Sequence, residues 1–152
     1  MRVGLISDTH GLLRPEAVAA LEGSDHIIHA GDIGPQELLE RLARIAPLTV
    51  VRGNNDTAPW AMELPERATL DIDGVVIHVI HDLKQWPGTP PEADVRVIVA
   101  GHSHRPHIQT RDGVLHVNPG SAGRRRFSLP VSVGRLQVDG GDVRASIIEL
   151  EV

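Results

Sequence analysis

Metal-binding side chains recur in this sequence directly after short apolar segments. Asp8 and His10 follow the first such segment, and Asp32 follows another. Together these clusters supply seven candidate metal ligands: Asp8, His10, Asp32, Asn54, His81, His102 and His104. Carboxylate, amide and imidazole groups without sulfur suit divalent ions, and we expect manganese, with nickel, zinc, iron or cobalt as alternatives.

Seven ligands are more than a single ion uses, because one ion takes about four to six. Two ions would use them all if a carboxylate bridged the pair, and Asp32 is the expected bridge because it stands alone between neighbouring clusters. Two-metal sites hold their ions roughly 3.5–4 Å apart and suit in-line displacement at phosphorus. Taken singly, each of these residues is more simply interpreted as a polar residue of a loop. Clustering all seven without an ion would destabilise the fold, because their polar groups would lack partners.

The first half of the chain alternates strand-like and helix-like segments. Residues 2–6, 26–30 and 48–51 are predicted strands, and residues 15–21 and 36–45 are predicted helices. This order predicts parallel strands with right-handed crossovers. Because ligands bind beyond the carboxyl ends of such strands, neighbouring strands would bring the metal-binding clusters to one edge.

The second half carries three hairpin signals, Asp73-Gly74, Asp112-Gly113 and Gly140-Gly141, each between two strand-like segments. Residues 95–100 form an apolar run that predicts a central strand. We therefore expect an α/β fold of two packed sheets with helices outside. The length of 152 residues suits one compact domain over residues 1–152.

Composition narrows the expected partners and location. The formal charge of −5 and the presence of only three aromatic residues disfavour binding to long nucleic acid. No apolar run approaches membrane-spanning length, and the N-terminus lacks a signal-peptide pattern, so we expect a cytoplasmic protein. The chain has no cysteine, which excludes thiolate zinc sites and cysteine nucleophiles. Small size and exposed sheet edges are compatible with a homodimer.

The order of the polar motifs resembles the calcineurin-like metallophosphoesterase superfamily. The motifs are Asp8-Thr9-His10, Gly31-Asp32, Gly53-Asn54-Asn55-Asp56, His81 and Gly101-His102-Ser103-His104. The chain length and the later segment Asn118-Pro119-Gly120-Ser121 are similar to the small single-domain bacterial and archaeal phosphodiesterase branch. The similarity covers nearly the whole chain.

This resemblance implies a four-layer αββα sandwich, in which two mixed sheets are flanked by helices. It also implies that one ion is held by Asp8, His10, Asp32 and His104. The second ion would be held by Asp32, Asn54, His81 and His102, and a hydroxide or water between the ions would attack phosphorus. The residues that act most directly in catalysis would be Asp32, Asn54 and His81.

Two positions depart from the pattern of the superfamily. Many members carry a histidine after the asparagine of the third motif, where it helps the leaving group depart, whereas this chain has Asn55, as the small branch often does. An amide does not donate a titrating proton at neutral pH, so we expect substrates with good leaving groups. Asp82 replaces the usual glycine of the fourth motif, and it could narrow the pocket, bind a cation of the substrate or point outward.

Further residues are expected near the substrate, namely Asn55, Asn118, Ser121 and Arg124. Arg124 begins a run of three arginines, for which a solvated surface is the simpler interpretation and a phosphate clamp the alternative. Asp56 either orients a ligand through a hydrogen bond or caps the next turn. The other five histidines are expected to be structural, with His116 the foremost exception.

The predicted activity is the hydrolysis of a phosphate diester in a small substrate, catalysed by a dinuclear metal site. One alternative is a phosphomonoesterase that acts on a small nucleotide or other phosphate. Another is a non-catalytic protein-binding module, since the superfamily includes a vesicle-coat scaffold subunit of this fold. A nuclease is a third, disfavoured by the acidic charge. The binding module predicts eroded ligands, whereas all seven ligand positions are filled here.

Overall fold

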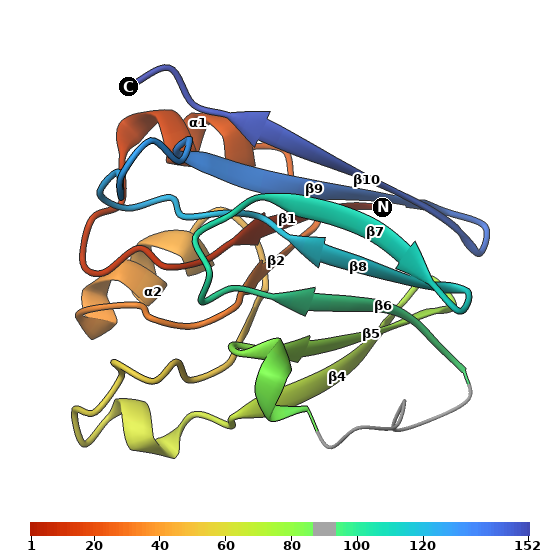
Figure 1. The fold of residues 1–152 in the computed structure, drawn as a ribbon, viewed down its shortest axis with the longest axis horizontal. Helices are drawn as coiled ribbons and strands as arrows, with labels where there is room; N and C mark the ends of the chain where they lie inside the picture. The colour runs from red at the N-terminus through yellow and green to blue at the C-terminus, as the bar shows by residue number, and fades with distance from the viewer. Residues whose placement is uncertain (87–93) are drawn as a thin grey trace.

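The computed structural model describes residues 1–86 and 94–152, whose strands form two five-stranded sheets (Figure 1). Sheet A contains β1 (Arg2–Ile6), β2 (His26–His29), β3 (Leu48–Val50), β9 (Ser132–Asp139) and β10 (Asp142–Glu149), in the order β10-β9-β1-β2-β3. Sheet B contains β4 (Arg67–Ile72), β5 (Val75–Ile80), β6 (Val95–Ala100), β7 (His107–Arg111) and β8 (Val114–Asn118), in the order β4-β5-β6-β8-β7.

Both sheets are mixed. In sheet A, β1, β2 and β3 are parallel, as the alternating strand and helix pattern predicts, and β9 adds antiparallel to β1. In sheet B, β5, β6 and β8 are parallel, and β4 and β7 flank them as antiparallel edge strands. The three predicted hairpins are present, and each turn uses left-handed backbone at both central positions, as at Asp73 (φ 50°) and Gly74 (φ 86°).

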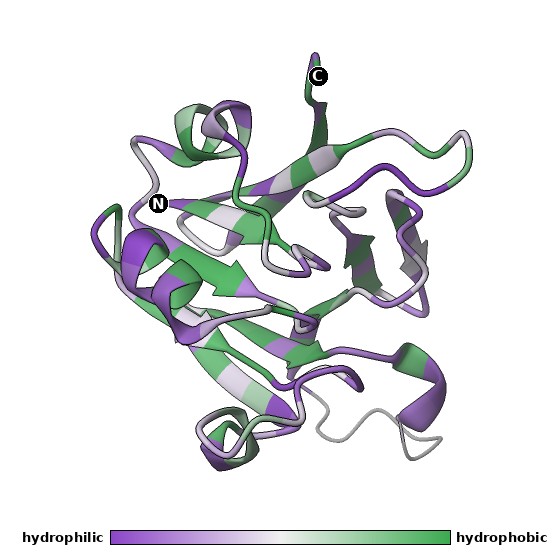
Figure 2. Cartoon of the chain, turned by 90° about the vertical axis from the view of Figure 1, so that its left-hand side faces the viewer, coloured by the Kyte–Doolittle hydropathy of each residue, from purple (hydrophilic) through white to green (hydrophobic). Residues whose placement is uncertain are grey.

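Two α-helices cover the outer face of sheet A. Helix α1 (Pro15–Leu21) has the predicted bounds, and α2 (Gln36–Ala43) ends two residues earlier than predicted. Both helices bury one apolar face, through side chains such as Leu21 and Leu42, against strand residues that include Ile6 and Ile27. Figure 2 shows the resulting segregation, with apolar residues concentrated in the strands and hydrophilic residues prominent in helix α2 and the loops.

The main core lies between the two sheets. Fully buried side chains of both sheets meet there, among them Leu5, Ile28 and Leu136 from sheet A and Ile77 and Val97 from sheet B. This packing confirms the predicted α/β sandwich of two mixed sheets.

Helical structure is scarce elsewhere in the described residues. It is limited to two 3-10 turns, η1 (Ala61–Glu63) between β3 and β4 and η2 (Leu83–Gln85) after β5. None of the described helices has the length and apolar character needed to cross a bilayer.

Candidate metal centre

The loops that follow β1, β2, β3, β5 and β6 meet at one end of the sandwich. Hydrogen bonds join the loops directly: Asp8 N donates to Gly31 O at 3.0 Å, and His102 N donates to Asp8 Oδ2 at 3.1 Å. The first bond joins the loops that follow two strands of sheet A, and the second crosses to the loop after β6 in sheet B. The polar clusters therefore converge from two sheets, where the sequence suggested the edge of one.

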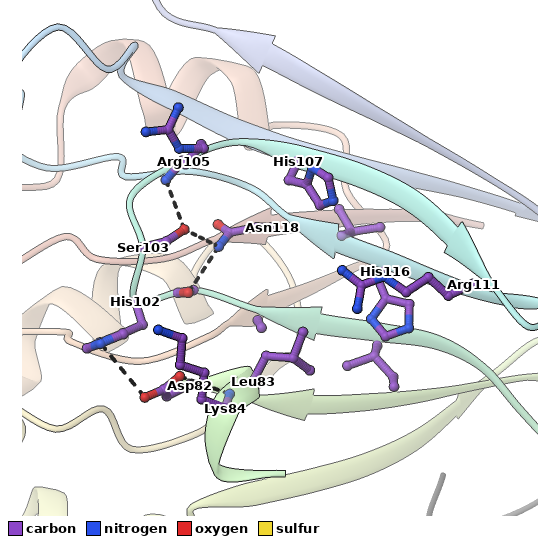
Figure 3. A pocket seen from close by; sticks show the side chains of 14 residues that line it. Asp82, Leu83, Lys84, His102, Ser103, Arg105, His107, Arg111, His116 and Asn118 are labelled. Atoms are coloured by element: carbon purple, nitrogen blue, oxygen red, sulfur yellow. Dashed lines mark hydrogen bonds and ion pairs between the residues drawn. The ribbon is translucent and has the colours of Figure 1, made fainter. Parts of the chain in front are cut away.

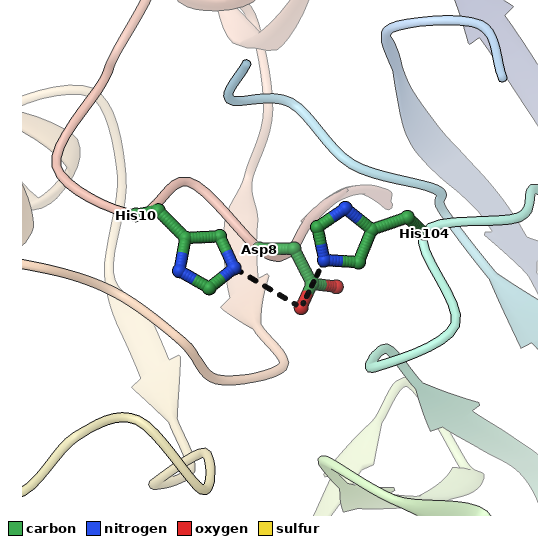
Figure 4. A group of neighbouring side chains, drawn as sticks. All are labelled: Asp8, His10 and His104. Carbon is green, nitrogen blue, oxygen red and sulfur yellow. Dashed lines mark ion pairs between the residues drawn. The ribbon is translucent and has the colours of Figure 1, made fainter. Parts of the chain in front are cut away.

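One group of candidate ligands consists of Asp8, His10 and His104 (Figure 4). Nε2 of His104 lies 3.5 Å from Asp8 Oδ1, and Nε2 of His10 lies 4.0 Å from the same oxygen. The two imidazole rings stack with their centroids 5.4 Å apart. Three ligand atoms thus surround a single point without hydrogen-bonding one another.

A second group consists of Asp32, His81 and His102. Nε2 of His81 lies 3.3 Å from Asp32 Oδ2, and Nε2 of His10, from the first group, lies 3.6 Å from the same oxygen. Asn54 joins through its Oδ1, 3.2 Å from His102 Nδ1. The structure therefore brings all seven candidate ligands together, with the Asp32 carboxylate between the two groups.

The donor set fits divalent cations. Asp8 is fully buried, and its Oδ1 has no hydrogen-bond partner among the residues that the structure describes. Three imidazole nitrogens nevertheless lie 3.5 to 4.0 Å from it, those of His10, His81 and His104. Ligand atoms about 2.0–2.2 Å from one ion are separated from each other by roughly 3–4 Å. A buried carboxylate oxygen in this position is costly unless a cation satisfies it.

Electrostatics shift the pKa values of the two central carboxylates in opposite directions. Burial raises the pKa of Asp32, but interactions with His81 and Asn55 outweigh burial and bring this pKa down to about 2. Burial likewise raises the pKa of Asp8, and here the nearby imidazoles and Ser7 do not offset it. Burial disfavours the charged form of His81, yet its contacts with Asp32 and Asp8 raise its pKa. These carboxylates attract positive charge to the centre.

Asp56 organises the backbone around Asp32. Its carboxylate accepts hydrogen bonds from three backbone N–H groups, those of Asp32 (2.9 Å), Ile33 (2.9 Å) and Gly53 (2.8 Å). Asn55 adds a backbone N–H at 2.9 Å and a side-chain N–H at 3.1 Å to the two Asp32 oxygens. Of the two interpretations of Asp56, the structure matches the hydrogen bond that orients a ligand loop.

Behind the ligands, His29 connects the first two loops. It is fully buried; its Nδ1 accepts from Gly31 N at 3.1 Å, so its Nε2 carries the proton and donates to Thr9 Oγ1 at 3.0 Å. The Thr9 hydroxyl donates in turn to Ile33 O at 2.7 Å. Burial, together with the positive charge of His81, lowers the pKa of His29 to about 3. His29 is therefore a neutral structural residue at neutral pH.

The candidate ligands have an unusual backbone conformation. Five of the seven lie in the left-handed region, namely Asp8 (φ 55°), His10 (φ 45°), Asp32 (φ 57°), His102 (φ 72°) and His104 (φ 62°). Residues other than glycine rarely adopt this region, and each costs on the order of 1 kcal/mol or more. Such strain concentrates where function requires a particular side-chain direction.

The other predicted site residues have varied positions. Asn118 Nδ2 donates to Gly101 O (3.0 Å) and Ser103 Oγ (3.1 Å), which supports the loop that carries two ligands. Ser121 is buried and donates to Asp8 O at 3.0 Å, whereas Arg124 is exposed. The other five histidines lie outside both ligand groups of the described residues.

Arg126 is a residue that the sequence analysis did not single out. Burial and the positive charge of Arg126 lower the pKa of His104 despite the neighbouring Asp8 carboxylate. Among the three arginines, the charge of Arg126 therefore acts on the centre. In the sequence, Arg126 is marked only by its place in a run of three arginines. That run gives no reason to choose Arg126 over Arg124.

Comparisons with known proteins define the class. Residues 1–141 match the calcineurin-like phosphoesterase superfamily domain, and the chain belongs to this superfamily. It is a metal-dependent phosphoesterase by family, and the resemblance drawn from its motifs is confirmed.

Individual relatives are similar over nearly their whole length. A probable metallophosphoesterase of Methanothermobacter thermautotrophicus is 34% identical over 160 residues, covering 97% of this chain and 92% of the relative. Phosphodiesterase YfcE of Escherichia coli is 28% identical, covering 91% and 89%. The crystal structure of Vps29 from Chaetomium thermophilum superposes with a TM-score of 0.80 at 19% identity, covering 99% and 95%, and it shares the fold.

Proposed function

We propose that this protein hydrolyses phosphate diesters with two divalent ions. Asp8, His10, Asp32 and His104 would hold one ion, and Asp32, Asn54, His81 and His102 the other. The observation that carries this proposal is the buried Asp8 Oδ1, faced by three imidazole nitrogens at 3.5 to 4.0 Å beside the shared Asp32 carboxylate. Manganese is the proposed metal, with nickel, zinc, iron and cobalt as alternatives.

Two divalent ions bound there would lower the pKa of a water molecule and stabilise the negative charge on the phosphoryl oxygens. The residues around the centre hold the metal ligands in fixed positions. Asp56 and Asn55 fix the Asp32 loop, and the Asn55 N–H groups hold the Asp32 carboxylate with its Oδ2 facing His10 and His81. Because these groups are held before substrate arrives, little reorganisation is needed during the reaction.

The preference for a diester with a good leaving group follows from Asn55. Its side chain donates to Asp32 and has no titrating proton for a departing alkoxide. We expect p-nitrophenyl esters to be cleaved at least tenfold faster than the corresponding alkyl esters. Equal rates would show that another group protonates the leaving oxygen. Phosphodiesterase YfcE, the relative named above, is consistent with a diester substrate.

The direct test is hydrolysis of bis(p-nitrophenyl) phosphate by protein that has been freed of metal and then supplied with manganese. We expect activity to require the metal and to disappear in Asp32→Asn, which keeps the shape of the side chain but removes the bridging charge. If manganese, nickel, cobalt and zinc all leave the diester intact while p-nitrophenyl phosphate is cleaved, the protein is a monoesterase.

A protein-binding module is the second candidate, supported by the similarity to the Vps29 fold. It predicts no turnover of either ester in the presence of any of these metals. The retention of ligand-type residues at all seven positions favours the enzyme.

A further inference from the structure

A cavity of about 620 Å³ lies on the outer face of sheet B, next to the candidate metal centre (Figure 3). Ile98 and Ala100 of β6 form part of its floor, because they alternate with Val97 and Val99, which face the core between the sheets. His102, a proposed metal ligand, lines the same cavity. The cavity and the metal centre are therefore contiguous, and one substrate of nucleotide size would fit across both.

The lining of the cavity is positive, although the chain has a net charge of −5. Lys84, Arg105 and Arg111 all line it, and in residues 1–86 and 94–152 none of them forms an ion pair with a carboxylate. Among the lining residues that the structure describes, Asp82 is the one carboxylate. It accepts a hydrogen bond from Lys84 N at 3.0 Å and lies 3.8 Å from His102 Nε2. An anionic ligand would neutralise this excess of positive charge.

The positive groups extend to the end of the cavity away from His102. Arg111 Nε donates to Gln109 Oε1 at 3.1 Å, and Figure 3 shows the guanidinium beside the His116 ring. Nδ1 of His116 is buried and has no hydrogen-bond partner in the part of the chain that the structure describes. Burial, Arg111 and His107 together lower the pKa of His116. The Arg111 guanidinium suits a phosphate group, because its planar N–H groups match phosphate oxygens in bidentate geometry.

The strand register gives the distance between the two ends. His116 of β8 pairs with Ile98 of β6, which precedes His102 by four residues. At about 3.3 Å per residue, and with the chain turning after Ala100, the His116 end lies on the order of 10 Å from the metal centre. Two directly linked phosphates would not span this distance, whereas a sugar-sized spacer over the apolar floor would.

We propose that the Arg111 end of this cavity binds a second phosphate group of the substrate. The inference rests on the proposed diesterase activity and adds a substrate class to it. The substrate would be a diester whose body carries a further phosphate, separated from the scissile phosphorus by a spacer such as a nucleoside. Arg111 and His116, which line that end of the cavity, are the residues assigned to this recognition.

The kinetic test compares two p-nitrophenyl esters of thymidine 5′-phosphate that differ only in a 3′-phosphate. With manganese-loaded protein, we expect the 3′-phosphate to raise kcat/KM about tenfold or more, mainly by lowering KM. Arg111→Gln should bring the ratio of the two kcat/KM values close to one. Arg144→Gln, an exposed arginine of β10 in sheet A, is the matched control and should leave the ratio unchanged. Equal kcat/KM values in the unsubstituted protein would overturn the phosphate site and leave the diesterase activity standing.

A binding measurement separates the two proposals further. Calorimetry with metal-free protein should show thymidine 3′,5′-bisphosphate binding about tenfold more tightly than thymidine 5′-phosphate, and Arg111→Gln should abolish the difference. If neither ester is hydrolysed but this difference is observed, the diesterase proposal fails and the phosphate site stands. Equal affinities for the two nucleotides would reject the site whatever the hydrolytic result.

Discussion

Nδ1 of His81, at the end of β5 in sheet B, lies 2.7 Å from the carbonyl oxygen of Ala30, at the end of β2 in sheet A. A carbonyl oxygen only accepts hydrogen bonds, so Nδ1 carries a proton and Nε2 faces the carboxylates of Asp8 and Asp32. One hydrogen bond thus ties the two sheets together and sets the tautomer that a metal ligand needs.

Two substitutions of His81 should separate these effects. His81→Asn retains an N–H near the position of Nδ1 but lacks Nε2, whereas His81→Ala removes both. We expect both variants to lose manganese-dependent hydrolysis. In chelator, urea unfolding should show His81→Ala less stable than His81→Asn by about 1–2 kcal/mol, because only the alanine leaves Ala30 O unsatisfied. Equal stabilities would show that the bond contributes nothing across the sheets.

Replacement of Asp56 should weaken both the fold and the metal site. Asp56→Ala leaves three backbone N–H groups without their acceptor, and we expect a loss of about 3 kcal/mol or more in the free energy of unfolding. Manganese affinity, measured by calorimetry, should fall about 10- to 100-fold. Asp71→Ala is the control, because Asp71 accepts a single backbone N–H in an exposed hairpin, and it should cost about 1 kcal/mol without changing metal affinity.

Gly101 is expected to tolerate no side chain. A Cβ there would collide with Ser7 Oγ and lie 2.8 Å from Asp8 Oδ2. Gly101→Ala should therefore displace Asp8, with a cost of about 1–3 kcal/mol and loss of metal-dependent activity. Gly74→Ala, in the β4–β5 turn, has open space around the added Cβ and should cost about 1–2 kcal/mol from its positive φ alone, with activity retained. An active Gly101→Ala variant would contradict the close approach.

The buried His29 predicts a loss of stability in mild acid. Its pKa is about 3 in the folded protein against 6.5 for an unperturbed histidine, so the unfolded chain binds an extra proton between these values. The stabilisation is complete above about pH 6.5 and declines as the pH falls, by about 2 kcal/mol at pH 5. Urea unfolding in chelator at pH 7 and pH 5 should show a decrease that is smaller by this amount in His29→Gln. The same decrease in both proteins would rule out His29 as its source.

Local signals in the sequence were sufficient for most elements. The Asp73-Gly74 and Asp112-Gly113 pairs predicted hairpins because both central positions of such a turn require positive φ, and both pairs have it. The candidate ligands could also be found in advance, because each cluster follows an apolar strand at the end where such sites form. These predictions depend only on neighbours in the chain.

The sequence alone did not predict which strands distant in the chain pair with one another. Arg2 of β1 pairs with Gln137 of β9, and no local pattern specifies a partner so distant in the chain. Likewise, His81 and His102 approach Asp32 from a second sheet, whereas the strand pattern suggested neighbours in one. The contribution of Arg126 depends on the path of a loop, which composition does not determine.

The left-handed backbone at Asp8, His10, Asp32, His102 and His104 restricts which residues could ever replace them. Apart from glycine, the residues that best tolerate this conformation are asparagine, aspartate and histidine, and these are also ligand types. Glutamate or a β-branched residue would destabilise the folded protein through its backbone conformation, whatever its ability to bind a metal. A related protein that has lost its metal should therefore carry mainly glycine and asparagine at these five positions. Its sequence alone would then indicate where the metal centre had been.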